Sequence, residues 1–120
     1  MHALVLLLVA LVAIEHLYFL YLEMFAWTQQ RTRRAFGTTA EFAEASKSLA
    51  ANQGLYNGFL AAGLIWSLVH PDPLMARQLQ LFFLGCVLLA ALYGGITVKR
   101  SILLIQGLPA ALALTAVLLV

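Results

Sequence analysis

The stretch ALVLLLVALVAIEHLYFLYLEMFAW, residues 3–27, decides the fold of this chain. As a helix rising about 1.5 Å per residue, it is long enough to cross about 30 Å of hydrocarbon. Yet it carries two carboxylates and an imidazole, at Glu15, His16 and Glu23. An acidic residue at the centre of a membrane helix costs about 2.5 to 3.5 kcal/mol on insertion scales. We therefore expect Glu15 to face the interior of a helix bundle, where it is partnered or protonated.

The composition of the whole chain indicates the same class of protein. Of its 120 residues, 63% are hydrophobic and 10% are charged, and the mean hydropathy is +0.94. Soluble domains carry roughly 25% charged residues, so these values predict an all-α, polytopic membrane protein. The net charge of +2 comes from cations in connectors, where they orient membrane proteins, and we expect no nucleic-acid partner.

Breaks between the apolar runs set the expected helices. The segment TTAE at 38–41 matches a capping box, so an amphipathic helix is expected over about 39–48, either at the interface or leading into the second span. The segment HPDP at 70–73 stops that span, and Pro109 predicts a kink or local unwinding in the last one. We expect one domain, residues 1–120, forming a four-transmembrane-helix bundle with helices over about 3–27, 49–69, 74–98 and 102–120.

The distribution of cations predicts the orientation. Lys and Arg residues concentrate on one side of the expected bundle, because the first loop holds four and the third turn holds two, whereas the other side holds only Arg77. The positive-inside rule then puts the first loop and Lys99-Arg100 in the cytoplasm and both termini outside.

Polar side chains gather on one face of each of the first two helices and, in this orientation, in the cytoplasmic half of the bundle. Glu15, with His16 beside it, is expected to be an acid–base or proton-carrying group. The candidate catalytic residues are Glu15, His16 and Glu23, and the candidate ligand-binding residues are Tyr18, Asn52, Gln53, Tyr56, Asn57, Tyr93 and Gln106.

Structural interpretations stay open for the same residues. Polar side chains in bilayers often hold helices together by hydrogen bonds, and tyrosines often pack at the interface. We expect no metal, because Glu15 and His16 are adjacent rather than spaced as in the Glu-x-x-His pairs of diiron bundles. Cys86 is expected to be a small core residue, and His2 and His70 to lie at the outer surface without a specific role.

The strings AIEHLYFLYLEMF at 13–25 and LAANQGLYNGFLAAG at 49–63 resemble the hallmark segments of a family of small bacterial integral-membrane proteins, domain of unknown function 1304. Gly85-Cys86 and Tyr93-Gly94 also fit, so the resemblance covers essentially the whole chain. It implies a multi-pass protein of the bacterial inner membrane and is nearly silent on activity.

A looser likeness is to the membrane-associated proteins of eicosanoid and glutathione metabolism, which are four-helix trimers. Those enzymes carry Arg and Glu in their second helix, where this chain has Asn52, Gln53 and Asn57. No substrate or site residue is therefore transferred from them.

The leading hypothesis is a protein that binds or transforms a small amphipathic or lipid-like molecule in a polar cavity in the cytoplasmic half of the bilayer. A non-enzymatic structural or accessory subunit is the first alternative, and a proton-coupled transport element is the second. Membrane lipids are the expected partners, and a homo-oligomer stays open. The sequence specifies no cofactor and does not decide whether the protein is an enzyme.

Overall fold

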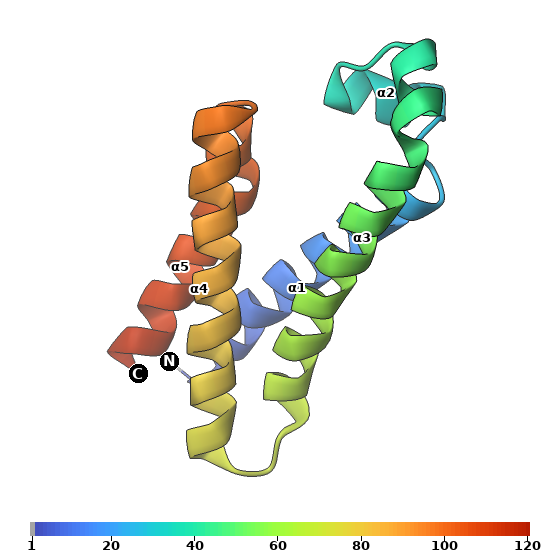
Figure 1. The fold of residues 1–120 in the computed structure, drawn as a ribbon. Helices are drawn as coiled ribbons and strands as arrows, with labels where there is room; N and C mark the ends of the chain where they lie inside the picture. Colours follow the sequence, from blue (N-terminus) through green and yellow to red (C-terminus); the bar gives the residue numbers. More distant parts are fainter. Residues whose placement is uncertain (1) are drawn as a thin grey trace. The chain divides into compact units, whose positions relative to one another are not determined.

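The computed structural model describes residues 2–120, and its regular elements are all helical. They are α1 (His2–Met24), α2 (Gln30–Phe36), α3 (Ala40–Val69), α4 (Pro73–Thr97), the π-helical segment η1 (Leu103–Gly107) and α5 (Leu108–Leu119) (Figure 1). The expected all-α class is confirmed, and residues 2–120 contain no strand. Two of the helices, α1 and α4, are long and apolar enough to cross a membrane by length and composition, and residues 103–119 form a shorter apolar stretch.

The chain divides into two compact units, which are described separately. Unit 1 comprises residues 2–14 and 60–120, and unit 2 comprises residues 15–59. Unit 1 has a core of aliphatic side chains, among them the fully buried Val9, Leu64 and Leu84 from α1, α3 and α4. In this unit α4 runs alongside η1 and α5 (Figure 1).

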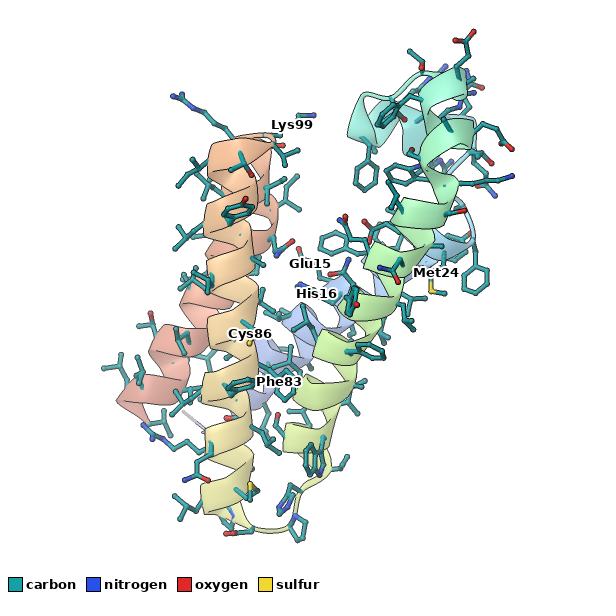
Figure 2. The ribbon with its side chains drawn as sticks, in the orientation of Figure 1. Glu15, His16, Met24, Phe83, Cys86 and Lys99 are labelled. Carbon is teal, nitrogen blue, oxygen red and sulfur yellow. The ribbon has the colours of Figure 1, made fainter. Side chains whose placement is uncertain are left out.

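Small residues let the helices of unit 1 approach closely. Gly63 of α3 lies against the ring of Phe83 on α4, and Gly95 of α4 lies against the side chain of Leu103 on η1. At both places an added Cβ would overlap those atoms. Cys86, expected in the core, is a half-buried free thiol on α4 (Figure 2).

The prolines of the HPDP segment at 70–73 separate α3 from α4, as expected. α3 ends at Val69, just before the prolines, and Pro73 occupies the first turn of α4, where its missing N–H costs nothing. Asp72 is the N-cap, and its Oδ1 accepts a hydrogen bond of 3.1 Å from the Leu74 N–H. The α3–α4 turn is therefore short and capped.

The irregularity expected from Pro109 is a π-helical turn just before it. The Leu108 N–H bonds to the Leu103 carbonyl, five residues back, so one extra residue fits into this turn. Within it, Gln106 Nε2 donates a hydrogen bond of 3.3 Å to the Val87 carbonyl of α4. Pro109 has no N–H to donate to the turn before it, and the wider register accommodates that gap.

The region between the first two expected spans contains a helix that the sequence analysis missed. The residues between the first span and about residue 39 were expected to form a loop, but α2 forms there, and its C-cap is Gly37, whose φ of 69° is left-handed. The first span also ends at Met24 rather than Trp27. Trp27 instead donates from Nε1 to Ser46 Oγ at 3.1 Å, and its ring meets Phe36 edge-on at 4.9 Å.

The expected pieces 39–48 and 49–69 form one continuous helix, α3, of 30 residues. The cap is Thr39, one of the two threonines of the capping-box segment, because its Oγ1 accepts a 3.0 Å hydrogen bond from the Phe42 N–H. No break occurs near Leu49, since the residues around it are good helix formers.

Candidate functional site

The candidate site lies in unit 2, where α1 meets α3. Glu23 is only 3% exposed, and its Oε1 accepts a hydrogen bond of 2.5 Å from Asn57 Nδ2. The Gln53 side chain also hydrogen-bonds this carboxyl group. Gln53 and Asn57 are four residues apart and so lie on one face of α3. The structure thus brings three of the predicted site residues together around one carboxylate.

Two glycines allow this close approach of α1 and α3. A Cβ on Gly54 would lie 2.8 Å from Met24 Cγ and 3.2 Å from the Leu20 carbonyl oxygen. A Cβ on Gly58, four residues later, would lie 2.6 Å from Leu20 Cδ1. Small residues at this spacing let helix backbones approach in membranes. The Gly54-x-x-x-Gly58 pattern is a signal that the sequence analysis did not use.

Glu15 and His16 are adjacent on α1 (Figure 2), and Glu23 follows two turns later in the same helix. Glu15 is half-buried, and its Oε1 is buried without a hydrogen bond to any described residue. His16 is fully buried, and its ring meets Phe19 edge-on at 5.2 Å. Glu15 is therefore a carboxyl group with unused acceptor capacity, unlike Glu23.

The other predicted residues are arranged differently. Asn52 is exposed on α3, and Tyr18 and Tyr56 are more than half exposed. Tyr18 stacks on Tyr21, and Tyr56 meets Phe59 edge-on. Two predicted residues belong to unit 1, the exposed Tyr93 and the half-buried Gln106 that bonds to α4.

The site offers acceptor chemistry and no metal centre. No group of three or more His, Cys, Asp or Glu side chains within residues 2–120 is placed to hold a metal ion. An ionised carboxylate only accepts hydrogen bonds, whereas a protonated one can also donate. Around Glu23 these bonds come from the protein itself, so a ligand would have to satisfy Glu15.

A second polar location was missed by the sequence analysis. The lining of a cavity at the α3–α4 turn in unit 1 includes four polar side chains, those of Ser67, His70, Arg77 and Gln80. His70 was expected to have no specific role, and Ser67 and Gln80 were not considered. One feature of the sequence could have indicated this location. Arg77 and Gln80 are three residues apart, so they lie on one face of α4.

Comparisons with known proteins identify the family of the chain. The family described as "Protein of unknown function (DUF1304)" matches residues 10–118. The "Uncharacterized protein YpaA" of Lactococcus lactis subsp. lactis (strain IL1403) is 40% identical over 108 residues, which cover 87% of each chain. No solved structure matches the chain. A family match over nearly the whole length, together with this relative, shows that the chain belongs to the DUF1304 family.

Proposed function

We propose that this chain is a polytopic inner-membrane protein that binds a small amphipathic molecule through Glu15. The single observation that carries the proposal is the buried Glu15 Oε1, which no described residue satisfies, on a helix of otherwise apolar character. Buried polar groups in proteins are nearly always hydrogen-bonded, so we expect this oxygen to accept a hydrogen bond when the site is occupied. A hydroxyl, amine or amide on a ligand would supply it.

The neighbouring residues support a fixed site around that oxygen. His16 is fully buried beside Glu15, so it is placed to orient the carboxyl group as a proton-carrying or acid–base group. Glu23 is held by Gln53 and Asn57, which keeps a second carboxyl group in a set position two turns further along α1. The exposed faces of Tyr18 and Tyr56 in the same unit suit the apolar part of an amphipathic ligand.

The membrane arrangement forms part of the proposal. Four spans would be α1, residues 49–69 of α3, α4, and the stretch 103–119. The apolar length of α1 and α4 supports two of them, and the cations at 31–34 and 99–100 support both termini being outside. In that topology Glu15 lies near the middle of the bilayer and Glu23 nearer the cytoplasm.

Native mass spectrometry of the full chain, purified in a non-ionic detergent, tests the proposal. We expect the wild type to carry a small molecule that the Glu15→Gln protein loses, because the amide replaces one acceptor oxygen with a donor. Glu41→Gln is the matched control, since Glu41 is exposed in the first turn of α3. A folded Glu15→Gln protein with the same bound molecules as the wild type would contradict the proposal.

A second candidate function, a structural or accessory membrane subunit, is favoured by the Glu23 cluster. Gln53 and Asn57 already satisfy Glu23, as expected for polar residues that hold helices together. This role predicts that Glu23→Gln lowers the stability of the protein or its complex and changes no bound molecule. The same mass spectra report copy number, so both outcomes are measured together.

A further inference from the structure

A cavity of about 430 Å³ lies wholly within unit 1, beside the α3–α4 turn. Its walls come from the first turn of α1, the last turn of α3, the first two turns of α4 and the end of α5. Cavities of about 300 to 1,000 Å³ are typical of sites for small organic ligands. None of the residues around Glu15 and Glu23 contributes to this wall, so the cavity is separate from the proposed site.

Gln80 is the feature of this wall that points to a ligand. Its side chain lines the cavity and is only 6% exposed, yet it makes no hydrogen bond to any described residue. A buried carboxamide normally has partners for its N–H groups and its oxygen. The Ser67 hydroxyl, which lines the same cavity, already donates to the Leu64 carbonyl at 2.5 Å. An occupant of the cavity would therefore satisfy Gln80.

Hydrogen-bond donors dominate the polar part of the wall. Arg77 lines the cavity one turn before Gln80, and its guanidinium carries five N–H donors. His70 Nδ1 accepts a hydrogen bond of 3.1 Å from the Asp72 N–H, so the ring proton lies on Nε2, which can donate.

No acidic side chain of the described wall opposes these donors. The described wall includes no Asp or Glu residue. Asp72, next to two lining residues in the sequence, is engaged as the N-cap of α4, where its Oδ1 accepts from the Leu74 N–H. Donors and a cation with no acidic side chain among them favour an anion.

The remaining wall is apolar. Val5 of α1 and Val117 of α5 are both almost fully buried and both line the cavity. We infer that the cavity binds an amphiphile with a phosphate head, which the donors of Arg77 and Gln80 hold while its chain lies against Val5 and Val117. Membrane phospholipids and soluble phosphate esters share this head chemistry.

Native mass spectrometry of the full chain in a non-ionic detergent tests this inference with two probes. Dodecyl phosphate carries the head and a chain, whereas inorganic phosphate carries the head alone. We expect dodecyl phosphate to bind and inorganic phosphate to bind more weakly. Arg77→Gln and Gln80→Leu should each weaken binding of dodecyl phosphate by about tenfold, because each removes hydrogen bonds to a charged head.

Matched controls separate the cavity from general surface charge. Arg100→Gln removes a cation outside the cavity, and Gln78→Leu changes an exposed glutamine on the same helix. Both control proteins should bind dodecyl phosphate as the wild type does. Arg77 is exposed, so its substitution tests the site even if Gln80→Leu impairs folding.

Three results would overturn the inference. The first is equal binding of dodecyl phosphate by the wild type and a folded Arg77→Gln protein, and the second is a loss of binding in Arg100→Gln as large as in Arg77→Gln. Equal affinity for inorganic phosphate would show a plain anion site with no part for the apolar wall.

Discussion

Asn57 and Asn52 lie one and a half turns apart on α3, and their side chains differ in burial and in hydrogen bonding. Asn57 donates to a buried carboxyl group, whereas the side chain of Asn52 is exposed and makes no hydrogen bond to any described residue. Periodicity could assign both to a polar face, because a helical wheel gives angles around one helix. The rotation of α1 against α3, which decides which amide meets Glu23, depends on packing at Gly54 and Gly58.

Asn57→Ala should lower the free energy of unfolding by about 1 to 3 kcal/mol, because it leaves the buried Glu23 with one hydrogen bond fewer. Asn52→Ala should stay within about 0.5 kcal/mol of the wild type, as usual for an exposed site. Thermal unfolding in detergent, followed by circular dichroism, measures both. Equal midpoints for the two variants would show that the Asn57 bond adds nothing to stability.

The glycines show which parts of each helix are constrained by a neighbour. Gly54 lies against the backbone oxygen of Leu20, which cannot move aside as a flexible side chain would, whereas nothing lies within 4 Å of a Cβ on Gly85. Both glycines lie inside helices, where glycine costs roughly 0.5 to 1 kcal/mol relative to alanine. Their difference is therefore one of packing.

Gly54→Leu should destabilise unit 2 by roughly 2 kcal/mol or more, because the side chain cannot fit between α1 and α3. Gly85→Ala should stabilise the protein by roughly 0.5 to 1 kcal/mol through helix propensity. Chemical denaturation of the two variants in detergent checks the signs. A stabilising Gly54→Leu would show that the close approach of the helices is absent.

The π-helical turn should let its helix tolerate the loss of one residue, which a regular helix such as α4 should not. Since η1 holds one residue more than an α-helical turn, deleting Leu104 should let this segment continue as α-helix with its later residues in register. Deleting Leu89 from α4 should rotate every later side chain by about 100° and disrupt the core. Both leucines are 69% exposed, so the deletions remove similar contacts.

Far-UV circular dichroism and thermal unfolding distinguish these two deletions. We expect the Leu104 deletion to keep a cooperative transition and the Leu89 deletion to lose it. If the Leu104 deletion is the more damaging of the two, the π-helical register is essential to the fold.

At the scale of the whole molecule, the sequence predicted the helical class and the break between α3 and α4, because apolar runs and prolines determine them locally. The end of α3 at Val69 and the start of α4 at Pro73 follow from the HPDP segment. α2 was missed because a seven-residue helix is marginal alone and depends on contacts such as that between Trp27 and Phe36. The cavity beside the α3–α4 turn was missed because residues from four helices form it.

Cysteine labelling of intact cells tests the proposed orientation. In a Cys86→Ala background, a membrane-impermeant maleimide should label Pro71→Cys in the outer turn and leave Ser48→Cys, in α3 just before the proposed span 49–69, unlabelled. Both positions are exposed, so accessibility within the chain is matched. Labelling of Ser48→Cys alone would reverse the topology, since the cations at 31–34 would then lie outside.

The contact of Trp27 with Ser46 and Phe36 has a spectroscopic consequence. The chain has two tryptophans, Trp27 in unit 2 and Trp66 in unit 1, and Trp66 is more than half exposed beside His70. Their indole emissions therefore report on different halves of the fold. In Trp66→Phe protein the fluorescence follows the loss of the Trp27 hydrogen bond, and in Trp27→Phe protein it follows the α3–α4 turn. Two single-tryptophan proteins can thus reveal whether the two units melt together or in succession.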